Sequence, residues 1–220
     1  FSANASKSKQ ATSRKKQLEK ITLDDIKPSS RKYPFVKFES QRDLGNDLLR
    51  VENVSKTIDG VKILDNINFT IRPGEKAAIL SRSDLAQTTM MQILAGTLKP
   101  DTGTVKYGQT VITSSLPRDL DANFNNEELS ILDWLRQYAT KEQNDNTFLR
   151  GFLGKMLFSG DDIQKQIKVL SGGEKVRCML SKMMLEQGNT LLLDDPTNHL
   201  DLESITSLND ALVSFNGSVI

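Results

Sequence analysis

Two adjacent carboxylates follow a short apolar run near the end of the sequence. Residues 191–201 read Leu-Leu-Leu-Asp-Asp-Pro-Thr-Asn-His-Leu-Asp. When a buried strand ends in acids, the first carboxylate, here Asp194, can hold a magnesium ion directly or through water. The second, Asp195, can orient or deprotonate an attacking water. A purely structural pair of acids is the alternative, because an acidic strand end is not specific by itself.

A second segment with chemical potential is Leu-Ser-Gly-Gly-Glu at residues 170–174, which opens a predicted helix. Ser171 and Glu174 have the spacing of a capping box, so local helix stability alone explains them. It does not explain Gly172 and Gly173, each of which costs a helix about 0.5–1 kcal/mol relative to alanine. Glycines there let a phosphate approach the free amides of a helix N-terminus. Both interpretations can hold together.

The family resemblance set out below implies a phosphate loop of the pattern G-x-x-x-x-G-K-[ST] after the strand expected at 77–80, and the residues at that position depart from this pattern. Serine and alanine replace the two glycines, and Gln87 replaces the lysine that neutralises the phosphates. Because a hydrogen bond to a charged group contributes about 1.5–3 kcal/mol, nucleotide affinity should fall roughly tenfold or more. The loop residues are Ser81, Arg82, Ser83, Asp84, Leu85, Ala86, Gln87, Thr88 and Thr89.

Part of the loop chemistry is retained. Thr88 keeps the hydroxyl that such a loop offers to Mg²⁺, so the candidate metal ligands are Thr88 and Asp194. Thr89 can still contact phosphate. Arg82 could supply a substitute positive charge.

These groups need a scaffold, which hydrophobic periodicity predicts in outline. Alternating and short apolar runs indicate strands, and spacings of three and four indicate helices. Asp59-Gly60 predicts a tight hairpin turn between the first two strands. The expected strands cover about 48–54, 61–71, 77–80, 110–115, 190–193 and the start of one at 217–220, and the expected helices cover 88–98, 201–213 and an insert within 128–187. Strands separated by helices predict an α/β body with a parallel sheet.

The composition is that of a globular protein, with 37% hydrophobic and 26% charged residues among 220. No run of about 18 apolar residues is present, so we expect no membrane-spanning helix. A single cysteine excludes a disulfide framework and is typical of a reducing compartment. A single histidine excludes a histidine-rich metal site.

The first 37 residues form a basic arm. They contain ten basic and three acidic residues, a net charge of +7, whereas the whole chain has +1. Such an arm often contacts nucleic acid or an anionic surface, and a solvated helix or linker is the alternative. The candidate RNA contacts are Lys7, Lys9, Arg14, Lys15 and Lys16.

These motifs together resemble an ATP-binding-cassette (ABC) ATPase. Leu-Ser-Gly-Gly-Glu and, about 20 residues later, Leu-Leu-Leu-Asp-Asp-Pro-Thr-Asn-His-Leu-Asp carry the resemblance, which covers essentially the whole chain. Pro-Thr-Asn-His-Leu-Asp and the basic stretch at 5–16 are similar to the soluble ABC-F subfamily. The implied fold is an α/β P-loop NTPase cassette with an antiparallel β edge, a helical subdomain at about 128–187 and a C-terminal truncation. Residues 1–46 would be the end of a linker and 47–220 most of the second cassette.

The resemblance implies that two cassettes close head to tail around two ATP molecules. Each site combines the phosphate loop and acidic strand of one cassette with the Ser-Gly-Gly motif of the other. In this chain the motif that serves the partner's ATP would be Leu170, Ser171, Gly172, Gly173 and Glu174. Asp201 would belong to the D-loop.

The resemblance also implies the cofactors, partners and location. The cofactors would be ATP and Mg²⁺, and the partners a second cassette in the same parent chain and the ribosome with its rRNA and tRNA. ATP state would control ribosome binding and release, in the cytoplasm and without membrane insertion. The ATP-binding subunit of a membrane transporter is the alternative.

Several positions depart from the family pattern. The usual catalytic glutamate is Asp195, and displacing a carboxylate by about 1 Å can cost roughly 10²-fold in rate. Arg118 replaces a glutamine that contacts the nucleotide site, and Ile58 replaces an aromatic that often stacks on adenine. The histidine that senses the γ-phosphate would follow Ile220.

Most of these losses fall on the site that this cassette would own, whereas residues 170–174 are intact. We therefore expect an asymmetric pair, with an impaired site here and a competent site completed in trans. The chain would be an ABC-type ATPase by family, weak or inactive in isolation. Weak ATP binding through the loop backbone is the alternative.

Overall fold

The computed structural model describes residues 32–220, of which Tyr33–Ile220 form one compact unit. The candidate RNA contacts between Lys7 and Lys16 lie outside the described residues. The strands are β1 (Leu49–Ile58), β2 (Val61–Ile71), β3 (Thr102–Tyr107), β4 (Thr113–Leu116), β5 (Thr190–Leu193) and β6 (Ser218–Val219), and the α-helices are α2 (Asp84–Leu94), α3 (Ile131–Arg136), α4 (Asn146–Lys155), α5 (Gly172–Glu186) and α6 (Leu202–Ser214). In this part of the chain, no helix is long and apolar enough to cross a bilayer.

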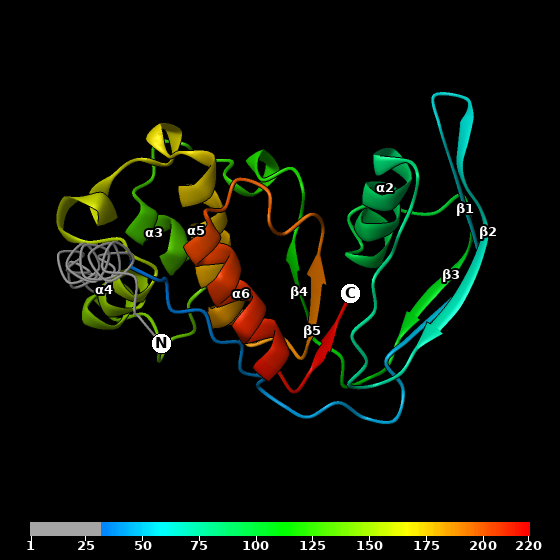
Figure 1. The fold of residues 1–220 in the computed structure, drawn as a ribbon, viewed down its shortest axis with the longest axis horizontal. Coiled ribbons are helices and arrows are strands. Elements are labelled where there is room, and N and C mark those ends of the chain that lie inside the picture. The colour runs from blue at the N-terminus through cyan, green and yellow to red at the C-terminus, as the bar shows by residue number, and fades with distance from the viewer. Residues whose placement is uncertain (1–31) are drawn as a thin grey trace, which may run out of the picture. The chain divides into compact units, whose positions relative to one another are not determined.

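Strand β5 is the middle strand of a parallel sheet with the order β4-β5-β6. Its alternating side chains enter two different cores. Leu191 packs with residues of α3, α4 and α5, whereas Leu192 packs with α2 and the antiparallel sheet. Figure 1 shows α5 and α6 on one side of β5 and α2 on the other. Because both faces are covered, the strand is a continuous apolar run.

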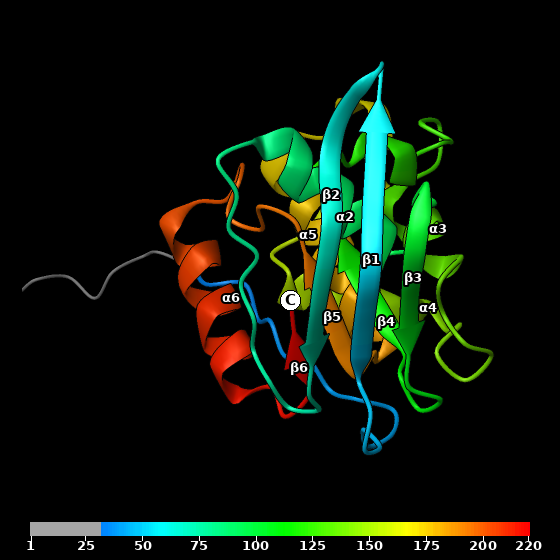
Figure 2. The same ribbon diagram turned by 90° about the vertical axis from the view of Figure 1, so that its right-hand side faces the viewer.

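The second sheet is antiparallel, with the order β2-β1-β3 (Figure 2). The predicted hairpin is confirmed: Ile58 pairs with Val61 across a two-residue turn. Asp59 and Gly60 have φ of 50° and 78°, which are the positive values that a type I′ turn requires. Strand β3 was not predicted, because the sequence Thr-Gly-Thr-Val-Lys-Tyr buries little and alternates weakly.

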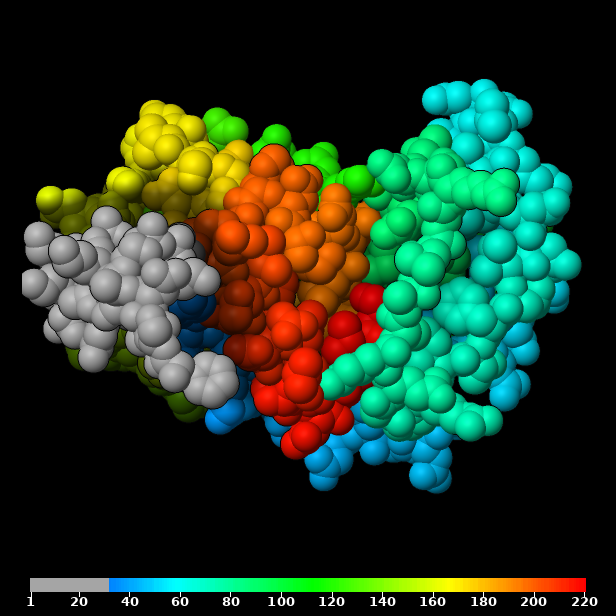
Figure 3. Space-filling view, viewed as in Figure 1, coloured from blue at the N-terminus to red at the C-terminus, as the bar shows by residue number. Residues whose placement is uncertain are grey.

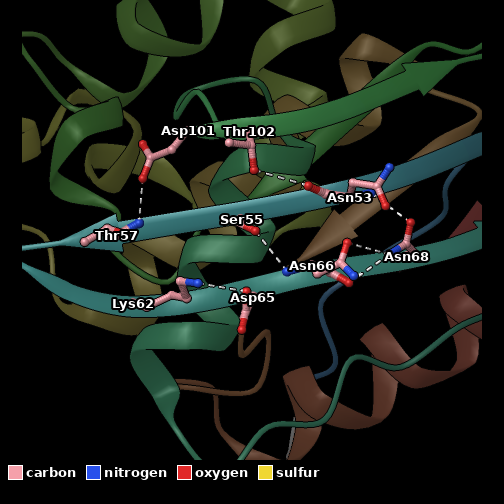
Figure 4. Close-up of polar contacts among 9 residues, drawn as sticks. All are labelled: Asn53, Ser55, Thr57, Lys62, Asp65, Asn66, Asn68, Asp101 and Thr102. Atoms are coloured by element: carbon pink, nitrogen blue, oxygen red, sulfur yellow. Dashed lines mark hydrogen bonds and ion pairs between the residues drawn. The ribbon is translucent and has the colours of Figure 1, made fainter.

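Strand β1 leaves the regular ladder at several points, and side chains replace the lost backbone partners (Figure 4). The carboxamide oxygen of Asn68 accepts a 2.8 Å hydrogen bond from the amide of Asn53. The hydroxyl of Ser55 accepts a 2.9 Å bond from the amide of Asn66. Bulges of this kind increase the local twist of a strand. These bonds therefore link the middle of β1 to β2 although the ladder there is irregular.

Residues 77–80 do not form the buried strand that their apolar composition predicts. Lys76 forms a bridge with Val219, and the amide of Ala77 donates to the Val219 carbonyl at 2.8 Å. The next residue, Ile220, uses its amide and carbonyl to bond β5 instead. Residues 78–80 thus find no neighbouring strand among the described residues, and Leu80 is 91% exposed.

Other predicted elements are present with different bounds. The helix expected at 88–98 begins at Asp84, and the strand expected at 110–115 covers Thr113–Leu116. Residues 128–187 contain α3, α4 and α5, with two short 3₁₀ segments between α4 and α5. The linker expected to reach residue 46 ends earlier, because Val36 and Phe38 are buried in the larger core.

A pair of glycine substitutions tests the packing of β3 on β1. A Cβ atom at Gly103 would lie 2.4 Å from the backbone of Asn53, whereas Gly60 has open space, and both have positive φ. We expect Gly60→Ala to lower the free energy of unfolding by about 1–2 kcal/mol, the cost of left-handed backbone. Gly103→Ala should cost about 1–3 kcal/mol more, because the neighbouring strand must move. Urea denaturation measures both, and equal losses would contradict the close approach.

Candidate functional site

The acidic end of β5 places two carboxylates in different environments. The amide of Asp194 donates to the Leu116 carbonyl at 2.9 Å, which continues the pairing with β4. Its side chain is buried, and Oδ1 has no hydrogen-bond partner among residues 32–220. Asp195 has φ of 54°, in the left-handed region that is uncommon outside glycine. This turn brings the second carboxylate to a half-buried position at the sheet edge.

Thr88 in α2 supplies a second buried oxygen, its hydroxyl Oγ1, which also has no hydrogen-bond partner in the described part of the chain. Helix α2 packs against β5, so this hydroxyl and Asp194 lie on neighbouring elements. Buried polar atoms are nearly always hydrogen-bonded, so two such oxygens point to a ligand. A hydroxyl and a carboxylate are hard donors that Mg²⁺ accepts together with phosphate oxygens and water. In residues 32–220 no group of three His, Cys, Asp or Glu side chains could hold a metal alone.

Two backbone amides of the phosphate-loop segment donate hydrogen bonds to hydroxyl groups of the same segment. Ser83 is the N-cap of α2, and its hydroxyl accepts a 3.3 Å hydrogen bond from the amide of Ala86. The hydroxyl of Ser81 accepts a 3.1 Å bond from the amide of Ser83. In a working phosphate loop, backbone amides of this kind point at the anion. In this chain two of them point at the loop's own hydroxyl groups.

Arg118, two residues after β4, joins the loop to the end of β5. Its Nη2 lies 3.2 Å from Oδ2 of Asp84 and 3.3 Å from Oδ2 of Asp195. Figure 3 shows the green α2 region and the orange segment after β5 next to each other on one face. Arg82, which could have replaced the missing lysine, is exposed and forms no ion pair within residues 32–220. The cation beside the acids is therefore Arg118.

The segment at 170–174 forms the start of α5 with a complete capping box. The Ser171 hydroxyl accepts from the amide of Glu174 at 3.3 Å, and the Glu174 carboxylate accepts from the amide of Ser171 at 2.9 Å. Burial alone would raise the pKa of Glu174, but the bonds from Ser171 and Lys165 outweigh it and hold the pKa below its usual value. This glutamate is therefore ionised at neutral pH and fixes the first turn.

His199 explains the two glycines that the capping box leaves unexplained. A Cβ atom at Gly172 would lie 2.9 Å from the ring Cγ of His199, and one at Gly173 would lie 2.8 Å from its carbonyl oxygen. The sequence alone suggested that these glycines admit a phosphate. The structure adds a second reason for them, close packing against His199, and the phosphate prediction stays a prediction.

Asp201 caps α6, and its carboxylate accepts a 2.8 Å hydrogen bond from the amide of Ser204. The hydrogen bonds from the side chain and amide of Ser204 lower the pKa of Asp201. A pocket of about 320 Å³ lies between this cap and the start of α5. A smaller one, of about 210 Å³, brings Arg118 next to Leu170 and His199. The structure thus gathers the predicted residues into two neighbouring groups.

Three features of the site were not predicted from the sequence. The cap at Ser83 had a local signal, a serine directly before an acidic first turn. The ion pairs of Arg118 join residues 34 and 77 positions apart, so no local pattern indicates them. The contact of His199 with the glycines likewise depends on the turn after β5.

The packing of His199 can be tested with an alanine at each glycine. Alanine normally stabilises a helix by about 0.5–1 kcal/mol relative to glycine, but we expect Gly172→Ala to lower the free energy of unfolding by about 1–3 kcal/mol. In a His199→Gly background, Gly172→Ala should instead raise the free energy of unfolding, because the ring that it meets has been removed. Gly173→Ala is the matched control, since the His199 carbonyl opposes it in both backgrounds. A stabilising Gly172→Ala in the native background would refute the packing.

The cap at Asp201 predicts a pH dependence of stability. A carboxyl whose folded pKa lies below its ordinary value of 3.8 stabilises the fold above that value, and the contribution disappears as pH falls through the folded pKa. Asp201→Asn keeps a good N-cap but does not titrate. We therefore expect the native chain to lose stability relative to Asp201→Asn as pH falls below about 4. If the native chain and Asp201→Asn differ in Tm by the same amount at every pH, the assignment is contradicted.

Comparison with known proteins places these features in one family. The family described as ABC transporter matches residues 64–198, more than half of the chain. The chain is 59% identical to the uncharacterized ABC transporter ATP-binding protein YkpA of Bacillus subtilis and 44% identical to the probable ATP-binding protein YbiT of Escherichia coli O157:H7. Each alignment covers all of this chain and 41% of the relative, so the chain spans about two fifths of their length.

More distant relatives agree with this placement. ABC transporter F family member 5 of Arabidopsis thaliana is 29% identical over 96% of this chain and 30% of its own length, in line with the resemblance to the F subfamily. The solved structure of cbiO1 from Clostridium perfringens, part of the ABC transporter complex cbiONQ, has a TM-score of 0.55 and 22% identity. It covers 80% of this chain and 78% of that one, and shows a shared fold. The chain belongs to the ABC transporter family, as an ATP-binding cassette.

Proposed function

We propose that this chain is a cassette of a two-cassette, ABC-F-type protein that couples ATP binding and hydrolysis to ribosome binding. The observation that carries the proposal is the contrast between two helix starts. Both starts have a serine N-cap, but the loop before α2 lacks the lysine and both glycines of a phosphate loop, whereas residues 170–174 keep Leu-Ser-Gly-Gly-Glu and a complete capping box. Such a chain is better suited to complete the ATP site of a partner cassette than to hydrolyse ATP at its own site.

The residues at the end of β5 have defined roles in this proposal. Thr88 and Asp194 would hold Mg²⁺, which neutralises charge on the β- and γ-phosphates when it is bound. Asp195 would be the residue that orients the attacking water, and Arg118 is already paired with it. An aspartate that is one methylene short and engaged by a cation is poorly placed for that task. We therefore infer little or no hydrolysis at this site.

The start of α5 would act on the ATP of the partner cassette. Ser171 and the amides of the first helical turn present a partial positive charge, which suits a phosphate group. Glu174 and Lys165 hold the turn in place through hydrogen bonds and an ion pair at 3.3 Å. Asp201, at the neighbouring helix cap, would face the same interface.

The ribosome part of the proposal rests on the ABC-F-like motif and on the basic arm. The similarity to an F family member and the net charge of the first 37 residues both support it. YkpA and YbiT are each more than twice as long as this chain, which leaves room in those proteins for a second cassette. Cations in the arm would bind RNA phosphates, which makes affinity fall with salt.

The second candidate is the ATP-binding subunit of a membrane transporter. The fold shared with cbiO1, which is part of a transporter complex, favours it. A transporter cassette needs an apolar groove for the coupling helices of its membrane partner, but it does not need a basic linker. Sedimentation with ribosomes separates the two candidates.

We expect the complete parent protein to sediment with ribosomes through a sucrose cushion when ATP is bound. The catalytic acid of the competent cassette is first neutralised so that ATP is trapped. Replacing Lys7, Lys9, Arg14, Lys15 and Lys16 by glutamine should lower ribosome affinity about tenfold or more, with a smaller salt dependence. The matched control replaces five basic residues of the cassette body. Absence from the pellet, despite demonstrated ATP-dependent closure, would favour the transporter.

A further inference from the structure

The Asp84–Arg118–Asp195 bridge is built from three residues of three separate segments. Asp84 is in the first turn of α2, Arg118 follows β4, and Asp195 follows β5. One atom, Nη2 of Arg118, lies within 3.3 Å of both carboxylates. The guanidinium is two-thirds buried, which limits screening of the pair with Asp195, while Asp84 is largely exposed.

The bridge joins the two segments between which a working cassette holds its nucleotide. In a working cassette, Mg²⁺ and the nucleotide phosphates join the loop before the helix to the acids after the strand. In this chain the same two segments are joined by protein side chains. Asp84 places a carboxylate at the N-terminus of α2, where the helix dipole favours an anion. Ser83 and Ser81 occupy loop amides that would otherwise be free.

We propose that the Asp84–Arg118–Asp195 bridge replaces the magnesium–nucleotide link and keeps this loop docked on β5 without nucleotide. Arg118 is the positioning residue, and Asp84 is a built-in anion at the helix start. This side of the cassette then stays assembled throughout the ATP cycle of the partner site. The inference deepens the proposed function, because it concerns the impaired site of that same asymmetric pair.

Hydrogen exchange of the amides between Ser83 and Thr89 tests the bridge directly, in the 220-residue chain without nucleotide. Arg118→Gln removes both ion pairs, and each partly exposed pair contributes modestly, so loop exchange should accelerate about threefold to tenfold. Arg118→Lys should restore most of the protection, since a single point charge can face both carboxylates. Arg82→Gln, the matched control, removes one positive charge from the loop itself without removing an ion pair of residues 32–220, and it should leave exchange unchanged.

Two further measurements separate a bridge from a general loss of stability. Asp84→Asn breaks only the contact with the loop, and its effect should not add to that of Arg118→Gln, since both variants lose the same interaction. Protection of the loop should weaken in 1 M salt in the native chain but not in Arg118→Gln. Exchange of β1 and β2 amides should not change in any variant.

Equal exchange in the native chain and Arg118→Gln would overturn the inference, as would equal acceleration by Arg82→Gln or additive effects of the two bridge variants. Faster exchange that Arg118→Lys fails to rescue would also overturn it. These outcomes leave the proposed function standing, because ribosome sedimentation is read on the complete protein. Conversely, a docked loop in a protein that does not bind ribosomes would leave the bridge intact and remove the ribosome proposal.

Discussion

The burial of β5 on both faces is the constraint on which the rest of the fold depends. Leu191 and Leu192 point in opposite directions and are each almost wholly buried, one in the helical core and one in the core under the antiparallel sheet. Fully burying a leucine contributes about 1.5–3 kcal/mol, so this strand joins the two cores strongly. Its end is consequently a fixed point, where Asp194 is held inside and Asp195 is turned to the edge.

The charges at that fixed point support the proposal that this site is impaired. Asp84 and Asp195 both lie against Arg118, the one cation that faces them among residues 32–220. A nucleotide would bring further negative charge, and Gln87 offers no positive charge to balance it. The start of α5 has no such conflict, because Lys165 and the capping box satisfy Glu174. This contrast supports the proposal that the cassette is poor at its own site and completes the site of its partner.

Sequence reasoning reached the features that depend on local chemistry. The hairpin at Asp59-Gly60, the buried strand at 190–193 and the capping box at Ser171 follow from turn residues, apolar runs and spacing, and the structure contains all three. Sequence reasoning failed where the structure of a segment depends on a neighbouring segment. Residues 77–80 are apolar enough for a strand but lack a partner for their ladder.

The same limit applies to the site. The loop, the acids and the glycines were identified from their types and order along the chain. The partners of those residues were not, since Arg118 meets Asp84 and Asp195 only after β4, α2 and β5 have packed together. His199 reaches the glycines through a turn with φ of 65°, which nothing in the local sequence requires.

Equilibrium titration of the chain with ATP, in Mg²⁺ and in EDTA, tests most directly whether charge at the loop limits this site. We expect weak binding that depends on Mg²⁺, and an increase of about tenfold or more in the Gln87→Lys variant, because a phosphate-facing cation is restored. Tight binding by the native chain, or a lysine variant that binds no better, would contradict the account.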